Sequence, residues 1–98
     1  MADYWLTFRV LENSGYQRRY DALIEAVNES GTGFWDGPTS FIAIRSSKSI
    51  DELGTAFRAA IDPLLDLFVI REIGKDSTRY VGVTGDGFES FFPNAKKL

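Results

Sequence analysis

The chain has 98 residues, of which 44% are hydrophobic and 26% charged, a composition typical of one ordinary globular domain. It contains neither cysteine nor histidine, so disulfides, thiolate nucleophiles, cysteine-ligated zinc and a Ser-His-Asp triad are excluded. The formal charge of −3 disfavours a general binder of nucleic acid or anionic membranes, but it leaves room for a local basic patch. Without an apolar run of membrane-spanning length or a secretory leader pattern, we expect a cytoplasmic protein.

The first half of the chain predicts the order strand, helix, strand, strand. Residues 4–11 alternate, which predicts a strand whose apolar face carries Tyr4, Leu6, Phe8 and Val10. The opposite face of this strand is mixed and carries Trp5, Thr7, Arg9 and Leu11. Ser14 and Gln17 have the spacing of a capping box, and an apolar stripe follows at helical spacing, so we expect a helix over residues 15–29. Two strands should follow, at Phe34-Trp35 and over residues 40–45, joined by the turn sequence Asp36-Gly37-Pro38-Thr39.

The second half predicts a further helix and two strands. Ser49 and Glu52 form a second capping box, and the apolar stripe behind it predicts a helix from about residue 50 to residue 61, where Asp62-Pro63 disfavours continuation. Residues 67–73 are an apolar strand, and a Gly74-Lys75-Asp76-Ser77 turn leads to a fifth, shorter strand over residues 78–83. A loose tail should follow, which contains Phe88, Phe91 and Phe92.

This order of elements indicates an α+β, ferredoxin-like βαββαβ sandwich with two helices on one face of an antiparallel sheet and an additional C-terminal β-strand. One domain should span residues 1–98, with a core of about residues 3–74 and a C-terminal strand and tail over residues 75–98 that can pair with a partner chain. The sheet face away from the helices needs a cover, and a second copy of the chain is the simplest one. Alternatively, the phenylalanine-rich tail folds back over that face within one chain. The candidate dimer-interface residues are Trp5, Thr7, Arg9, Val69, Arg71, Tyr80 and Val81.

Three stretches of the chain carry a resemblance to a known family. They are the aromatic strand Tyr4 to Val10, the run from Phe34-Trp35 through Asp36-Gly37-Pro38-Thr39-Ser40-Phe41, and Ile61-Asp62 through Asp66-Leu67-Phe68-Val69-Ile70. Over roughly residues 4–74 the chain resembles the small ferredoxin-like group of CRISPR-adaptation nuclease-like subunits, VapD-type ribonucleases and short, uncharacterised SinR-like bacterial proteins. The resemblance implies a homodimer whose sheets face each other, with the C-terminal strand added to the partner's sheet.

In nuclease members of that group, an Asp at the end of the first strand is taken to hold a divalent metal between protomers. The matching position here is Arg9, and a guanidinium repels a cation that needs oxygen ligands. The resemblance therefore implies the fold and the dimer but not the metal site, and we expect no catalytic residue, no metal and no cofactor. In a closed dimer face, Arg9 should meet a carboxylate such as Glu72 or a backbone carbonyl of the partner.

Three functions remain open, and a non-catalytic homodimer with a regulatory role is favoured. The second is a metal-dependent ribonuclease of the toxin or VapD type that uses Glu12, Asp36 or Asp3 in place of the missing Asp. The third is nucleic-acid binding without cleavage, although residues 41–44 lack the Gly-aromatic pattern of RNA-binding strands. Its candidate residues are Arg9, Arg18, Arg19, Arg45, Lys48 and Arg79.

Overall fold

The computed structural model of the chain describes residues 1–74 and 77–98 and has an α+β architecture. Part of the predicted turn at residues 74–77 therefore lies outside the described residues. In chain order the elements are β1 (Ala2–Arg9), α1 (Tyr16–Ser30), β2 (Gly33–Trp35), β3 (Phe41–Ser46), α2 (Ile50–Arg58), β4 (Leu67–Glu72), β5 (Arg79–Tyr80), α3 (Phe88–Phe91) and β6 (Lys96–Lys97). The predicted succession of the first six elements is confirmed, with boundaries that move by at most three residues.

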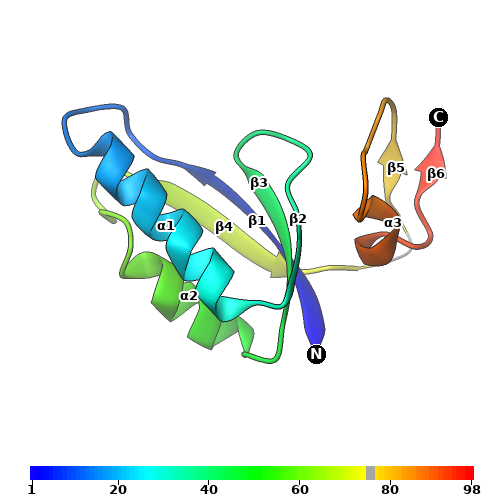
Figure 1. The fold of residues 1–98 in the computed structure, drawn as a ribbon, viewed down its shortest axis with the longest axis horizontal. Helices are drawn as coiled ribbons and strands as arrows, with labels where there is room; N and C mark the ends of the chain where they lie inside the picture. The colour runs from blue at the N-terminus through cyan, green and yellow to red at the C-terminus, as the bar shows by residue number, and fades with distance from the viewer. Residues whose placement is uncertain (75–76) are drawn as a thin grey trace.

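Four strands form the main sheet in the order β2-β3-β1-β4, and every neighbouring pair is antiparallel (Figure 1). The central strand β1 pairs on both sides, so that Leu6 lies opposite Ile42 of β3 and opposite Ile70 of β4. The edge strand β2 is connected to β3 by a loop, and the other edge strand, β4, is connected to β3 through helix α2. This arrangement is compatible with the ferredoxin-like sandwich that the sequence predicts.

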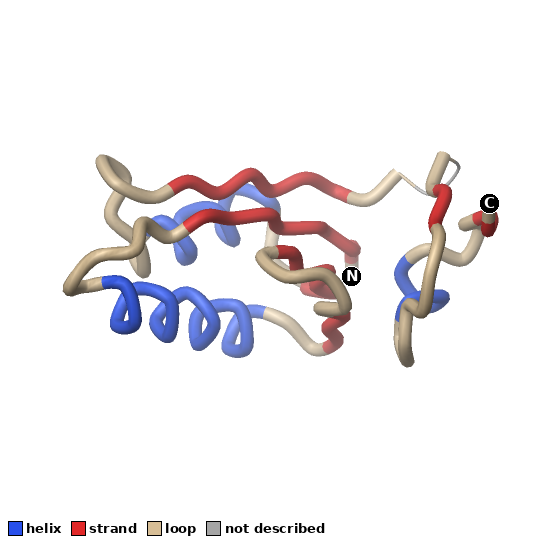
Figure 2. The backbone as a smooth tube through the Cα atoms, turned by 90° about the horizontal axis from the view of Figure 1, so that it is seen from above, coloured by secondary structure: helices blue, strands red, loops and turns tan. Residues whose placement is uncertain are grey.

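Helices α1 and α2 lie on the same side of the sheet (Figure 2). Alternate residues of β1 face them, as predicted, because successive side chains of a strand point to opposite faces. The hydrophobic core lies between the sheet and these two helices. Its buried residues are Tyr4, Leu6, Phe8, Val10, Leu23, Val27, Ile42, Ile44, Leu53 and Phe57. One face of the sheet is thereby closed by the first 74 residues.

The two predicted capping boxes have different outcomes. Ser49 and Glu52 form the expected pair, with the Ser49 hydroxyl accepting from the Glu52 N–H and the Glu52 carboxylate accepting from the Ser49 N–H. These hydrogen bonds hold the pKa of the Glu52 carboxyl below its usual value. The Ser14 box is wrong: helix α1 begins after Gly15, which makes no side-chain cap, and the Asn13 carboxamide accepts from the Gly15 N–H instead.

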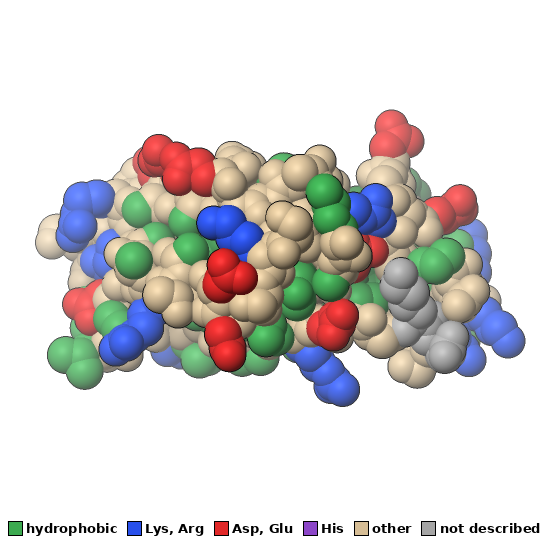
Figure 3. All heavy atoms as spheres, turned by 90° about the horizontal axis from the view of Figure 1, so that it is seen from below, with side chains coloured by type: hydrophobic (Ala, Val, Ile, Leu, Met, Phe, Trp, Pro, Cys, Tyr) green, Lys and Arg blue, Asp and Glu red, His purple; other side chains and the backbone are tan. Residues whose placement is uncertain are grey.

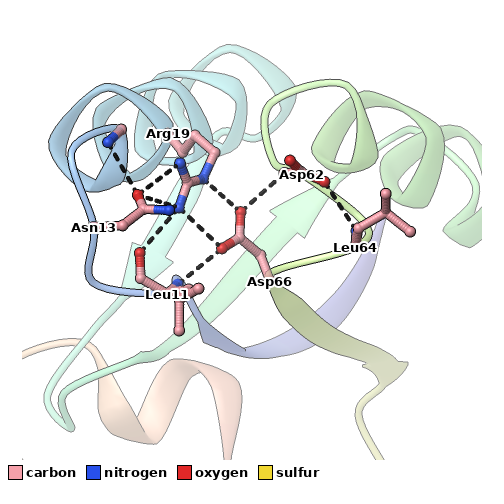
Figure 4. Close-up of polar contacts among 7 residues, drawn as sticks. Leu11, Asn13, Arg19, Asp62, Leu64 and Asp66 are labelled. Atoms are coloured by element: carbon pink, nitrogen blue, oxygen red, sulfur yellow. Dashed lines mark hydrogen bonds and ion pairs between the residues drawn. The ribbon is translucent and has the colours of Figure 1, made fainter.

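A buried ion pair joins α1 to the loop before β4 (Figure 4). The Arg19 Nε lies 2.8 Å from the Asp66 Oδ2, and the side chains of both residues are almost completely buried. The remaining guanidinium donors reach the Leu11 carbonyl and the Asn13 carboxamide, at 2.9 and 3.2 Å. The Asp66 carboxylate in turn accepts from the backbone N–H groups of Leu11 and Asp62, at 2.8 and 2.9 Å.

This network determines the charge state of Asp66. Burial alone raises the pKa of a carboxyl group, because the charged form loses its hydration. The N–H groups of Asp62 and Leu11 and the guanidinium of Arg19 oppose that effect, and together they hold the pKa of Asp66 below its usual value. Asp66 is therefore an anion at neutral pH, and its charge and its lone pairs are matched by partners.

The C-terminal segment corrects the predicted fifth strand and the predicted loose tail. Only Arg79–Tyr80 of the expected residues 78–83 is a strand, and it pairs in parallel with β6, in a separate two-stranded sheet. Residues 88–91 form the short helix α3. The segment lies beyond one end of the main sheet, on the opposite side from the exposed loop that precedes α1 (Figures 1 and 2).

Replacing Asp66 with asparagine is expected to lower the free energy of unfolding at neutral pH by about 3 kcal/mol or more, because the buried Arg19 loses its anionic partner. The folded pKa of Asp66 is depressed, so its contribution is present above the unfolded pKa of about 4 and is lost as the pH falls through the folded pKa. Urea unfolding of both proteins from about pH 7 to about pH 2 tests this, and the difference should narrow in acid.

The matched control is Glu12→Gln, which changes an exposed carboxylate in the loop that carries Leu11 and Asn13. Its effect on the free energy of unfolding should stay within about 0.5 kcal/mol at every pH. If Asp66→Asn lowered the free energy of unfolding by the same amount at both ends of the pH range, the assignment of the ion pair would be contradicted.

Candidate binding surfaces on the open sheet face

The sheet face that points away from α1 and α2 is built by the odd-numbered residues of the three longest strands. In β1 these residues are Asp3, Trp5, Thr7 and Arg9. Trp5 lies between Ala43 of β3 and Arg71 of β4, whereas Thr7 lies between Phe41 and Val69. Arg9 lies opposite Leu67 at the far end of the ladder. Trp5, Thr7 and Arg9 therefore share this face with Leu67, Val69 and Arg71 of β4.

The C-terminal segment covers one end of this face. Phe88, Phe91 and Phe92 are buried together with Ala43 and Ile73, and they form a second apolar cluster. The partly buried residues that pack against this cluster are Trp5, Trp35, Phe41, Tyr80 and Ala95. The alternative in which the phenylalanine-rich tail folds back within one chain therefore holds for this end of the sheet.

Arg45 fastens the C-terminal segment to the sheet. Its guanidinium binds the Asp3 carboxylate through two atoms, at 2.8 and 3.1 Å, and its Nη2 also donates to the carbonyl and hydroxyl of Ser90 at 3.2 Å. The guanidinium carbon lies 5.0 Å from the centre of the Phe91 ring, which is a cation–π distance. The hydrogen bond and the charge of Asp3 raise the pKa of Arg45 above its usual value.

A pocket of about 570 Å³ lies between the C-terminal segment and the sheet. Its aromatic lining comes from β1, β2, β3 and the C-terminal segment, and it consists of Trp5, Trp35, Phe41, Tyr80, Phe88 and Phe92. We call this hollow the aromatic pocket. The Trp35 indole is held in place at its edge, because its Nε1 donates to the Thr84 carbonyl at 2.8 Å, and its ring packs 4.9 Å from that of Phe88.

The other end of the face stays open in the described part of the chain. Leu67 is 53% exposed and Val69 is 46% exposed, although both belong to strand β4 of the main sheet. Thr7, Arg9 and Arg71 are exposed beside them. We call these five residues the exposed patch. Among the predicted interface residues, Tyr80 is instead half-buried against Phe88, and Val81 is exposed at the rim of the aromatic pocket.

The structure separates the acidic candidates. The Asp3 carboxylate is bound by Arg45, Glu12 lies in the loop between β1 and α1, and Asp36 lines a hollow beside Tyr16 and Tyr20. Within residues 1–74 and 77–98, no three acidic groups come close enough together to hold a metal ion. Glu72 does not face Arg9 in one chain, because it lies opposite Tyr4, whose pKa is raised by burial and then by the Glu72 and Glu52 charges.

The basic candidates are likewise dispersed. Arg19 is buried against Asp66, and Arg45 is bound to Asp3. Arg18 lies on α1, Lys48 precedes α2, and Arg79 lies in β5, whereas Arg9 belongs to the exposed patch. On the side of the molecule drawn in Figure 3, acidic and basic side chains are scattered among hydrophobic ones.

A scan against protein-family models found no match, and neither did a search of curated protein sequences. In the described part of the chain, no helix is both long enough and apolar enough to cross a membrane. The open sheet face therefore carries two candidate binding surfaces, the aromatic pocket and the exposed patch.

Replacing the buried Phe88 with alanine is expected to lower the free energy of unfolding by about 3 kcal/mol and to shift the tryptophan emission to longer wavelength, because the cavity admits water to Trp35. Chemical unfolding and the emission spectrum of the folded protein measure the two effects. The control is Leu98→Ala, at an exposed position of the same segment, which should change neither. An unchanged emission spectrum in Phe88→Ala would show that the C-terminal segment does not shield Trp35.

Proposed function

We propose that this chain is a non-catalytic, ferredoxin-like protein of the cytoplasm that forms a homodimer through the exposed patch and acts through protein contacts. The observation that carries the proposal is the exposure of Leu67 and Val69 on a sheet face that the C-terminal segment covers only in part. Apolar side chains on a flat sheet face are stabilised when a second surface removes them from water.

The layout of the patch suits a second copy of the same chain. A two-fold axis brings the same patch from each copy together, so the patch must be compatible with itself. Val69 and Thr7 form its middle, and Arg9 and Arg71 lie at its opposite ends. With the axis near the middle, Val69 and Thr7 of the two copies meet at the centre. Leu67 and the two arginines lie toward the ends, where water and backbone carbonyls can satisfy the guanidinium groups.

The resemblance to the CRISPR-adaptation nuclease-like and VapD-type group supports the same assembly, in which sheets face each other. We propose membership of that group on this pattern of residues. The position that carries the metal-binding Asp in its nucleases holds Arg9 here, exposed at the end of β1, which favours a role in binding over a role in cleavage. A ribonuclease would have to use Glu12 or Asp36, since Asp3 is bound to Arg45.

Nucleic-acid binding is the second candidate, because Arg9 and Arg71 share the open face with Trp5. Backbone phosphates would contact the two guanidinium groups, and a base would stack on the indole. This candidate requires the face to be free, so it competes with the dimer for the same surface.

Light scattering coupled to size-exclusion chromatography tests the dimer, on the wild-type chain and on Val69→Lys. We expect the wild type to have the mass of two chains and the variant that of one, because two lysines at the centre of a self-paired patch repel each other. The control is Leu64→Lys, which places the same charge at a position that is 93% exposed and lies outside the patch. It should keep the mass of the wild type.

A wild-type chain with the mass of one copy at all concentrations would contradict the proposal. The nucleic-acid candidate would then move ahead if a single-stranded oligonucleotide binds with an affinity that falls steeply with rising salt. A dimer that persists in Val69→Lys would place the interface elsewhere on the chain.

A further inference from the structure

The aromatic pocket has the size and lining of a small-molecule site. Its volume of about 570 Å³ lies within the range of roughly 300 to 1,000 Å³ that ligand pockets occupy. Its walls come from segments far apart in the sequence, the main sheet and the C-terminal segment. A hollow lined from both of these segments can contact a ligand on more than one side.

The floor of the pocket is lined by aromatic rings from the main sheet. Trp5 and Phe41 stack with an angle of 22° between their planes and 6.2 Å between their centres. Trp35 meets Phe41 edge-on, at 6.0 Å and 74°. Rings in two orientations offer both stacking and edge contacts, which favour a flat aromatic ligand over an aliphatic one.

The wall formed by Trp35 is rigid. Gly37 lies against this indole so closely that a Cβ built on it would be 2.5 Å from the ring, so any side chain there would displace the tryptophan. The hydrogen bond from Trp35 Nε1 to the Thr84 carbonyl holds the same edge of the ring, because Nε1 is also among the atoms closest to that Cβ position. A pre-formed wall lowers the entropic cost of binding.

The charge at the pocket favours an anion. Among the described residues that line the pocket, Arg79 carries the only charge, in a chain whose formal net charge is −3. One of its nitrogens donates to the Thr78 carbonyl, and the exposed guanidinium has further donors for a ligand. A carboxylate or phosphate at the rim would be met by a cation and by no carboxylate among the lining residues that the structure describes.

We propose that the aromatic pocket binds a flat aromatic molecule that carries an anionic group, with the ring system on Trp5 and Phe41 and the anion at Arg79. The site is independent of the proposed dimer, because the exposed patch contains none of its lining residues. An apolar peptide segment or a second copy of the chain could fill the pocket without using the charge of Arg79. Neither of these occupants is flat.

The test uses 2-naphthoate as the probe, with two matched compounds. The chain has only two tryptophans and both line the pocket, so their two indole N–H signals in a ¹⁵N NMR titration report on the site directly. We expect 2-naphthoate to shift both signals saturably. The neutral 2-naphthamide should bind about three times more weakly, because it lacks the charge. Cyclohexanecarboxylate should bind at least about ten times more weakly, because it is not flat and cannot stack.

Arg79→Gln separates the charge from the ring contacts. The side chain is exposed, so the variant should fold like the wild type. It should weaken 2-naphthoate about threefold and leave 2-naphthamide unchanged. Arg58→Gln, which removes an exposed cation from α2 on the opposite side of the sheet, should alter neither affinity.

Trp5→Leu should weaken both aromatic probes about tenfold, because it removes the largest ring of the floor. The titration is repeated on Val69→Lys, which leaves the pocket lining intact, so that failure of the dimer does not affect the result. Indole signals that do not move with 2-naphthoate, or cyclohexanecarboxylate binding as tightly as 2-naphthoate, would overturn the proposal. If Arg79→Gln bound 2-naphthoate as tightly as the wild type does, the placement of the anionic group at Arg79 would be overturned.

Discussion

The ion pair between Arg19 and Asp66 is the constraint on which the two-layer arrangement depends. One carboxylate receives the Arg19 guanidinium and the backbone N–H groups of Leu11 and Asp62. It thereby ties together the loop after β1, the first turns of α1 and the loop before β4. Because β1 and β4 are neighbours in the sheet, this tie positions both helical crossovers at one end of the same strand pair. The attraction within a buried ion pair offsets the loss of hydration only when the other donors and acceptors of both side chains are also hydrogen-bonded. Here backbone groups supply those hydrogen bonds.

Because both long helices cover the same face of the sheet, the opposite face can be covered only by the C-terminal segment or by another molecule. A chain of this length has two substantial helices, and both are used on the same side of the sheet. The open face therefore depends on the C-terminal segment, whose short elements reach only the end near Trp5 and Ala43. The aromatic pocket and the exposed patch are consequences of this partial cover: the first lies beneath the edge of the segment, and the second lies beyond it.

Features with local causes were predictable, and those that depend on distant partners were not. Alternation in β1 and the Ser49 capping box are encoded by neighbouring residues, and both are confirmed. Arg19 looks like a surface charge beside Arg18, and its burial depends on a carboxylate 47 positions away. The same network engages Asn13 and replaces the cap predicted at Ser14. Residues 78–83 have strand composition, but only Arg79 and Tyr80 find partners, in a strand near the chain's end.

The Asp3–Arg45 pair explains how the two surfaces can act separately although they share one face. The pair lies on the sheet end that is remote from Arg9 and Leu67, and it holds the segment through Ser90 and Phe91. Contacts at the exposed patch therefore do not need to displace the segment that completes the pocket. Arg71 is the place where the surfaces meet, because it belongs to the patch and lies opposite Trp5. Arg71 does not line the pocket, so a dimer that uses Arg71 leaves Arg79 in place for a bound anion.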